Sequence, residues 1–405
     1  MHGITLTKAP ADWEILQQEN GKASVALKGN FQVHPAAIEV GVERVTPVVR
    51  VMREDDNMTV IPWTNADHFT CNEKFQGEFE VTLEIPAGGP YRIDTSLETK
   101  STVPDLTWLY RGDCVLHLGV GNLFIIAGQS NSAGYSRDFC IDPPSMDVHL
   151  YRNRSKWDIA SHPMNESTFA GSLANEEMGV PGVSPYLAFG KTYGKMTGMP
   201  VGLIQTSLGG SPMERWNPKD GDLYLNMVDK IHQTGGRYAG VLWYQGCSDT
   251  NPGPAEKYLE HFREYVEATR KELGYEIPFF TMQLNRQING INDECWGMVR
   301  DAQARAAKEI PGVSVLTTSN LSLCDGIHNT AQANVALGEK LAKQCAHVLN
   351  GKEEYQPPEL VKVERTDEAE RKSFQLEGSG IWLKLTCDHV KNCFLVYSAV
   401  GKDSG

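Results

Sequence analysis

The chain contains an apolar segment, Asn122-Leu-Phe-Ile-Ile-Ala127, followed directly by Gly128-Gln129-Ser130-Asn131-Ser132. A short apolar run of this kind predicts a buried strand, and the glycine after it allows a sharp turn. In open α/β sheets, the chemistry lies at the carboxyl ends of the strands. The segment therefore predicts a sheet that presents Ser130 at its reactive edge.

The region that follows alternates between strand and helix patterns. Four further apolar segments lie at residues 201–207, 240–245, 277–284 and 313–319, between helical patterns at 184–197, 221–234, 254–273, 296–309 and 329–349. Within the third helix, Tyr258, Leu259, Phe262 and Val266 fall on one face, as in a helix packed on a sheet. The alternation predicts a parallel five-stranded sheet covered by helices on both faces, in a unit spanning residues 116–350.

The two ends of the chain have a different pattern. Residues 1–115 contain short strand-like pieces, separated by Gly, Pro, Asn or Asp, at 24–27, 37–41, 46–51, 58–61 and 78–85. Their alternation of polar and apolar residues predicts an N-terminal antiparallel β-sandwich. Residues 351–405 are strand-like again at 360–363, 380–386 and 393–397, which predicts the start of a C-terminal β unit.

The composition excludes several classes of protein. A net charge of −13 argues against nucleic acid and anionic membranes as partners. No run approaches the length of a membrane span, and the start lacks the pattern of a signal peptide, so neither is expected in this chain and the compartment stays open. The nine cysteines include no Cys-x-x-Cys pair, and no His-Glu-x-x-His motif occurs. No metal or other cofactor is therefore expected.

A candidate base and a carboxylate lie far downstream, in Asp325-Gly-Ile-His328. A serine hydroxyl is a weak nucleophile until a base takes its proton. His328 can accept that proton from Ser130, and Asp325 can fix the histidine tautomer, in the chain order Ser, Asp, His. The alternative is that Asp-x-x-His only precedes the cap of the next helix.

A tetrahedral intermediate needs hydrogen-bond donors for its oxyanion. The backbone N–H of Ser130 is one candidate. Gly209 or Gly210 offers a second, since glycine lets the backbone approach the substrate closely, and the alternative for this pair is a plain turn. The sequence does not decide which glycine donates.

Four blocks together resemble a known family: Gly128-Gln-Ser-Asn131, Gly209-Gly-Ser211, Trp243-Tyr-Gln-Gly246 and Asp325-Gly-Ile-His328. In this order, over about residues 122–350, they resemble the SGNH-type esterases, specifically the sialate O-acetylesterases and the acetyl xylan esterases of carbohydrate esterase family 6. The resemblance implies a three-layer α/β/α, flavodoxin-like domain. It also implies that the Gln245 amide is a third oxyanion donor, the alternative being a core glutamine bonded to backbone.

The residues expected to contact the substrate are Gln129, Asn131, Arg215, Trp216, Arg300 and Gln303. Arg300 and Gln303 are one helical turn apart, and the family has a similar pair near its substrate. A solvated helix face is the alternative for this pair, and burial is the alternative for the tryptophan.

One position departs from the family pattern. The family has glutamate after Trp-x-Gln-Gly, where this chain has Cys247. A cysteine cannot replace a carboxylate that pairs with an arginine or orients a neighbour. The geometry of the residues that support the site is therefore left open by the sequence. Cys247 is also an alternative nucleophile, although Ser130 occupies the turn where the nucleophile is expected.

The expected function is that of a serine esterase that removes O-acetyl groups from a carbohydrate through an acyl-serine. Only the resemblance indicates that the acyl group is acetyl and that the alcohol part of the ester is a sugar such as sialic acid. The alternatives are an acetyl xylan esterase, another carboxylesterase, or a non-catalytic carbohydrate-binding protein that retains the fold. Cys247, in place of the family's glutamate, leaves the non-catalytic alternative open. The presence of Ser130, Asp325 and His328 argues against that alternative. The oligomeric state stays open.

Overall fold

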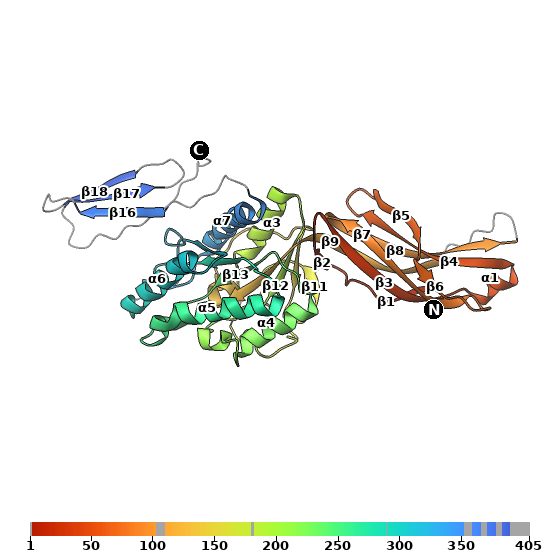
Figure 1. Cartoon of the computed structure of the whole chain (residues 1–405), viewed down its shortest axis with the longest axis horizontal. Helices are drawn as coiled ribbons and strands as arrows, with labels where there is room; N and C mark the ends of the chain where they lie inside the picture. The colour runs from red at the N-terminus through yellow and green to blue at the C-terminus, as the bar shows by residue number, and fades with distance from the viewer. Residues whose placement is uncertain are drawn as a thin grey trace.

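The computed structural model of the chain describes residues 2–102, 110–179, 182–288 and 290–351. It also gives the backbone of three antiparallel strands, β16 (Glu359–Arg365), β17 (Arg371–Glu377) and β18 (Leu383–Asp388). The predicted strand at 393–397 lies outside the described residues. Figure 1 shows a β-rich N-terminal part joined to a part in which helices surround a sheet.

The N-terminal part contains two groups of strands around one core. A four-stranded antiparallel sheet has the order β1-β3-β7-β6, with β1 at Gly3–Lys8, β3 at Lys22–Gln32, β7 at Gln76–Pro86 and β6 at His68–Phe69. In the second group, β4 (Val42–Arg53) pairs with β5 (Thr59–Asn65) and β8 (Gly88–Ser101). Side chains of both groups, such as Val25 and Ile93, pack in the same hydrophobic core.

One predicted strand in this part is wrong. The segment 37–41 overlaps a short helix, α1 (Pro35–Glu39). Pro35 occupies the start of the helix, where its missing N–H costs nothing, and the His34 side chain accepts the N–H of Ala36 at 3.1 Å. These two local features favour a helical turn over the strand that Ile38 and Val40 suggest.

A single long strand, β9 (Tyr110–Gly128), runs through both parts of the molecule. Its first half pairs antiparallel with β8, and its second half pairs parallel with β12 (Val201–Gln205) and β13 (Gly240–Tyr244). The short strand β2 (Ile15–Gln17) adds a parallel pairing at the midpoint, Gly119–Gly121. The Gln17 side chain accepts the N–H of Leu123 at 2.8 Å. The two parts are therefore hydrogen-bonded across their junction.

The parallel sheet has the order β10-β12-β9-β13-β14-β15, with β11 (Trp157–Ile159) antiparallel at its edge. The new strands are β10 (Val148–Tyr151), β14 (Phe279–Met282) and β15 (Val313–Leu316). The sequence predicts five parallel strands, and β10 is the one it misses. This strand has only four residues and includes His149, so it lacks the long apolar run that marks β9.

Helices cover both faces of this sheet (Figure 1). On one face lie α3 (Tyr186–Thr197) and α7 (Ala331–Asn350), and on the other lie α4 (Asp222–Gln233), α5 (Pro254–Leu273) and α6 (Asp293–Glu309). The side chains of β9 alternate between the two cores. Phe124 and Ile126 pack with α3 and α7, whereas Leu123 and Ile125 pack with the other three helices. This double burial explains why residues 123–127 of β9 are all apolar.

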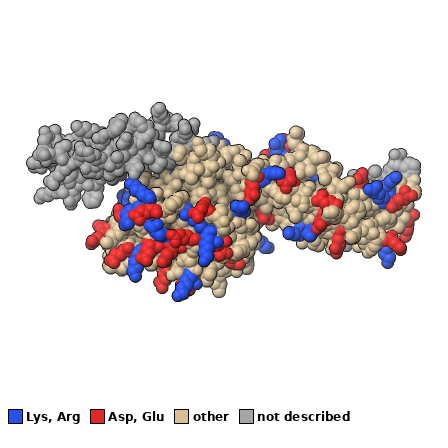
Figure 2. All heavy atoms as spheres, viewed as in Figure 1, with Lys and Arg blue, Asp and Glu red and all other residues tan. Residues whose placement is uncertain are grey.

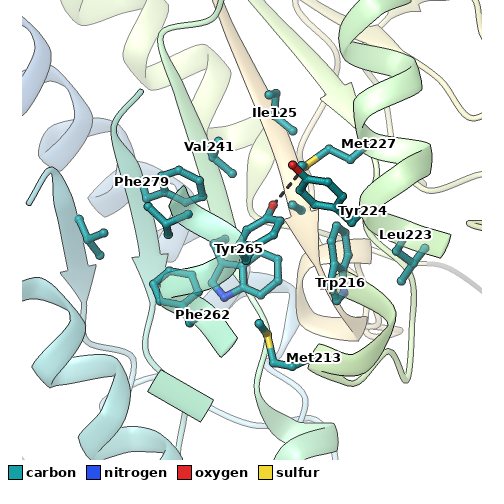
Figure 3. Close-up of a cluster of buried hydrophobic side chains, with 14 of the residues drawn as sticks. Ile125, Met213, Trp216, Leu223, Tyr224, Met227, Val241, Phe262, Tyr265 and Phe279 are labelled. Carbon is teal, nitrogen blue, oxygen red and sulfur yellow. Dashed lines mark hydrogen bonds between the residues drawn. The ribbon is translucent and has the colours of Figure 1, made fainter. Parts of the chain in front are cut away.

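The core beneath α4 and α5 is rich in aromatic side chains (Figure 3). Trp216, Phe262 and Tyr265 are almost completely buried there. The Tyr265 hydroxyl lies 3.1 Å from Met227 Sδ. This dense packing fixes the carboxyl ends of β9 and β13, where the candidate site lies.

The surface in Figure 2 shows Lys and Arg intermingled with Asp and Glu over the α/β part. No basic patch stands out on this face. Among the described residues, no helix combines the length and the apolar character needed to cross a membrane.

Candidate active site

Ser130 lies at the carboxyl end of β9, where it begins the short helix α2 (Ser130–Ala133). The turn requires glycine at position 128, which has a φ of +129°. A Cβ at this position would lie 2.3 Å from the carbonyl oxygen of Tyr244 in β13. Gly128 thus lets the chain turn against the neighbouring strand and places Ser130 at the edge of the sheet.

The three predicted catalytic residues meet at this edge. Ser130 Oγ lies 2.8 Å from His328 Nε2, and His328 Nδ1 lies 2.6 Å from Asp325 Oδ2. The other oxygen of Asp325 accepts the backbone N–H groups of Ile327 and His328, at 2.8 and 2.7 Å. Desolvation raises the pKa of Asp325, but these hydrogen bonds outweigh it and the net pKa is lowered. The carboxylate is thus charged where it faces the imidazole.

Gln129 and Asn131 flank Ser130, and both are buried. Asn131 donates to the carbonyl of Ile327 at 3.2 Å and accepts the N–H of Asn329 at 3.1 Å, so it holds the loop that carries His328. Gln129 Oε1 accepts the N–H of Gly246 at 2.9 Å and that of Ser248 at 3.2 Å. The amide oxygens of both residues therefore accept backbone N–H groups, and the Gln129 NH₂ group donates to Ser248 Oγ at 3.4 Å, so the two residues align loops on either side of Ser130.

The N–H groups of Gly209 and Gly210 differ in whether they already have a hydrogen-bond acceptor. Gly209 N–H donates to Glu177 Oε2 at 2.9 Å. Gly210 has a φ of +67°, and its N–H has no hydrogen-bond partner among the described residues. The N–H of Ser130, at the start of its helix, has none there either. Two backbone donors are therefore free next to the nucleophile turn.

Gln245 is completely buried at the end of β13. Its Nε2 donates to the carbonyl of Ser211 at 3.0 Å and to Asp249 Oδ2 at 2.5 Å, so both N–H bonds of the amide are used. Its Oε1 has no partner in the described part of the chain. Gln303, which is also buried, donates to the Gln245 carbonyl at 2.8 Å. The structure brings these two glutamines together below the glycine turn.

The other expected substrate contacts lie in different surroundings. Arg215 pairs with Asp222 at 2.6 Å and donates to the Ala174 carbonyl at 2.8 Å. Trp216 lies in the aromatic core of Figure 3, with no exposed surface. Arg300 donates to Ser319 Oγ at 2.5 Å, and desolvation lowers the pKa of its guanidinium. Among the described residues, no hydrogen bond or ion pair joins these three side chains to Ser130 or His328.

Cys247 follows Gln245 and Gly246 in a short 3-10 turn, Cys247–Asp249. Desolvation raises the pKa of its thiol to about 12. A thiolate is therefore strongly disfavoured at neutral pH, which argues against Cys247 as a nucleophile. Within the described residues, no group of three or more His, Cys, Asp or Glu side chains is arranged to hold a metal ion.

Two residues that sequence reasoning missed complete the surroundings of the triad. The Tyr135 ring lies over the His328 imidazole, with ring centroids 5.3 Å apart. Its hydroxyl donates to Glu177 Oε1 at 2.6 Å. Glu177 Oε2 accepts from Asn165 at 3.0 Å as well as from Gly209. One carboxylate thus connects the Tyr135 ring, which contacts His328, to the glycine turn. Glu177 lies in a polar loop without a motif, so no local signal marks it.

A buried polar network supports Glu177 from behind. Asn165 accepts from Asn153 at 2.7 Å, and Asn153 accepts from Asn175 at 2.7 Å and from Lys230 Nζ at 3.1 Å. Lys230 also donates to the Gln205 carbonyl at 2.5 Å. All of these side chains are almost fully buried. Desolvation lowers the pKa of Lys230 from 10.5 to about 7.

This lowered pKa predicts a pH-dependent stability. The unfolded chain binds a proton at Lys230 up to about pH 10.5, whereas the folded chain releases it near pH 7. The free energy of unfolding should therefore rise with pH in this window, by up to about 1.4 kcal/mol per pH unit. Lys230→Met should remove this contribution. The free energies of unfolding of the wild type and of Lys230→Met are measured with denaturant between pH 7 and 10. The prediction would be contradicted if both free energies changed with pH to the same extent.

Comparison with known proteins gives consistent matches to this region. A family model described as "Carbohydrate esterase, sialic acid-specific acetylesterase" matches residues 120–347. A protein of Arabidopsis thaliana described as a "probable carbohydrate esterase" is 26% identical over 245 residues, which cover 55% of this chain and 88% of that protein.

A solved structure extends the likeness to most of the chain. It is described as a novel carbohydrate acetylesterase from Xanthomonas citri, and it matches with a TM-score of 0.55 and 19% identity. The match covers 93% of this chain and 82% of that one. At this level of identity the likeness concerns the fold.

Proposed function

The chain belongs to the sialic acid-specific acetylesterase family of carbohydrate esterases, and from this premise we propose that it hydrolyses O-acetyl esters of a carbohydrate through an acyl-serine. The observation that carries the proposal is the continuous contact from Ser130 Oγ through His328 to Asp325, at 2.8 and 2.6 Å. These distances are those of a nucleophile, its base and the group that orients the base.

In the proposed reaction, Ser130 Oγ attacks the acetyl carbonyl carbon while His328 Nε2 takes the hydroxyl proton. The tetrahedral intermediate collapses, and His328 gives that proton to the departing sugar oxygen. Water then attacks the acyl-serine, again losing a proton to His328, and the serine leaves as a hydroxyl with release of acetate. Asp325 accepts the Nδ1–H throughout and stabilises the imidazolium.

The same proposal assigns the oxyanion to the free backbone donors. Ser130 N–H and Gly210 N–H have no partner among the described residues, whereas Gly209 N–H already donates to a carboxylate. An anion next to Glu177 would be repelled, which favours Gly210 over Gly209. The Gln245 amide could donate to the oxyanion only after breaking its hydrogen bond to Ser211 or to Asp249. With both bonds formed, its role is to hold the turn.

We also propose the SGNH-type, three-layer arrangement for residues 116–350, with the segments 1–115 and 351–405 as accessory β units. Helices on both faces of a parallel sheet support this assignment, as does the nucleophile at the carboxyl end of β9. The family supports an acetylated carbohydrate as the substrate class.

Acetate release tests the proposed activity. Acetylated sialic acids, acetylated xylo-oligosaccharides and a chromogenic acetate are compared under the same conditions. Release from at least one carbohydrate, with a higher kcat/KM than for the chromogenic ester, is the expected result. The proposal fails if no substrate in the panel releases acetate above the rate in buffer.

Glu177 provides a further prediction, since it fixes both Tyr135 and Gly209. Glu177→Ala should lower kcat on a chromogenic acetate about 10- to 100-fold, because small displacements of catalytic groups cost this much. KM should change little. Glu177→Gln keeps an acceptor for Gly209 and Asn165 and should recover most of the loss. Melting temperatures control for folding, and an unchanged or raised kcat in Glu177→Ala would contradict this role.

A further inference from the structure

Lys230 of α4 lies inside the α/β part with 1% of its surface exposed, and no step of the proposed reaction uses it. Its Nζ donates to Asn153 Oδ1 at 3.1 Å and to the Gln205 carbonyl at 2.5 Å. Within the described residues, Nζ has no other acceptor and no carboxylate partner. An ammonium group is rarely buried in this way, because a buried charge needs an opposite charge nearby.

The two contacts of Lys230 fit an uncharged amine. A neutral amine has two N–H bonds, one for each acceptor, whereas an ammonium has a third donor that would be buried without a partner. Desolvation lowers the pKa of this group to about 7, and the carboxylate of Asp229, which is exposed on the same helix, opposes the shift only in part. The Glu177 carboxylate is separated from Nζ by two asparagine side chains.

The first acceptor of Lys230 leads to the glycine turn through side chains. Asn153 Nδ2 donates to Asn165 Oδ1 at 2.7 Å, and Asn165 Nδ2 donates to Glu177 Oε2 at 3.0 Å. The same carboxylate oxygen accepts the N–H of Gly209 at 2.9 Å. Both asparagines have no exposed surface, so water does not compete for these bonds. Three hydrogen bonds therefore connect Asn153 to the backbone of the turn.

The second acceptor leads to the same turn along the backbone. Gln205 is the last residue of β12, and its Oε1 accepts from Ser207 N at 3.1 Å and from Ser207 Oγ at 2.7 Å. Ser207 lies two residues before Gly209 and is fully buried. The two routes, one through Asn153 and one through Gln205, thus form a closed network that starts and ends at Gly209. Lys230 is the residue that joins them.

We propose that Lys230 is a positioning residue for the oxyanion donor, and that only its uncharged amine holds the glycine turn in the active geometry. The proposal rests on the proposed function, because the donor concerned is the N–H of Gly210, which directly follows the anchored Gly209. Protonation would place a charge and a third donor in a network that has no acceptor for them. Small displacements of catalytic groups lower turnover about 10- to 100-fold.

The kinetic test compares two lysine variants of the full-length chain. Lys230→Met keeps an unbranched side chain and removes both hydrogen bonds and the ionisation. Lys340→Met is the matched control, because Lys340 is half-buried on α7, with Nζ 3.5 Å from Asn320 Oδ1 and no bond to the network. Kinetics on a chromogenic acetate are measured from about pH 5 to about pH 9. Melting temperatures control for folding.

Lys230→Met should lower kcat about 10- to 100-fold near pH 8 and change KM less than about 2-fold. In the wild type, kcat/KM should fall with decreasing pH because His328 must be neutral, and protonation of Lys230 should add to this fall. Near pH 7 the decrease should therefore exceed about tenfold per pH unit in the wild type and in Lys340→Met. In Lys230→Met it should be about tenfold per unit.

A second measurement does not depend on turnover. The backbone amide resonance of Gly209 is followed by NMR against pH in His328→Ala, where the imidazole cannot contribute. Its shift should change with a midpoint near pH 7, and the change should be absent when Lys230→Met is added. This titration of Gly209, if the wild type released no acetate, would contradict the esterase proposal and still support the link between Lys230 and the turn.

Three results would overturn the proposal. The first is a Gly209 resonance that does not change near pH 7 in His328→Ala, a result that does not require Lys230→Met to fold. The second is a decrease of kcat/KM with pH that is equally steep in Lys230→Met and in the wild type. The third is a lowered melting temperature of Lys230→Met with unchanged kcat, which would show that the lysine only stabilises the fold.

Discussion

Ser130→Ala should reduce kcat on acetate esters by about 10⁴- to 10⁶-fold. The alanine has no oxygen to attack the carbonyl, and only water remains as a nucleophile at the carboxyl end of β9. The His328 imidazole, 2.8 Å from Oγ in the wild type, would lose its partner but keep its bond to Asp325. Acetate release measures the loss, and an organophosphonate reagent should label the wild type and not the variant.

Ser132 is the matched control for this change, because it lies in the same short helix. Its hydroxyl is fully buried, 2.7 Å from the Tyr186 hydroxyl and 3.0 Å from the Ala127 carbonyl, with no contact to His328. Ser132→Ala should therefore remain at least about 10³-fold more active than Ser130→Ala. Retention of wild-type turnover by Ser130→Ala would show that another group is the nucleophile.

Asp325→Asn is expected to lower kcat by about 10⁴-fold, although it changes only one atom. One carboxylate oxygen accepts two backbone N–H groups, and an asparagine would keep its carbonyl oxygen there. Its NH₂ group would then face His328 Nδ1, which would have to become an acceptor. The ring proton would move to Nε2, and the base could no longer take the proton of Ser130.

Asp138→Asn serves as the comparison for this substitution. Both oxygens of Asp138 accept the N–H of Ala331 at the start of α7, at 2.9 and 3.0 Å, and an asparagine oxygen can replace them. Its kcat should stay within a few-fold of wild type. If Asp325→Asn lost less than about 10-fold, another group would have to orient the imidazole.

The mixed α/β fold and the family could be predicted because their signals are local. The apolar run of β9 and Gly128 lie next to each other in the sequence, and Asp325 and His328 lie in one short loop. Periodicity also marks the long helices well, as the confirmed α5 illustrates. The misread segments are those in which local patterns are too short: the four-residue strand β10 and the five-residue helix α1.

The surroundings of the triad could not be predicted, because they depend on contacts between distant segments. Glu177 meets Gly209 across 32 positions, and Asn131 meets Ile327 across 196. The motif pattern singles out Gln129 and Asn131 as important positions, but only the fold shows that their amide oxygens accept backbone N–H groups. The choice between two adjacent glycines likewise depends on which N–H a distant carboxylate accepts.

The passage of β9 through both parts of the molecule has a mechanical consequence. A chain that crosses between two bodies as a free linker allows them to swing, but β9 makes the crossing as one ladder-bonded strand, reinforced by β2 at its midpoint. This continuous hydrogen bonding limits how far the N-terminal strands can swing relative to Ser130, which follows the far end of the same strand. The continuous pairing of β9 therefore opposes hinge movement between the two parts of the molecule.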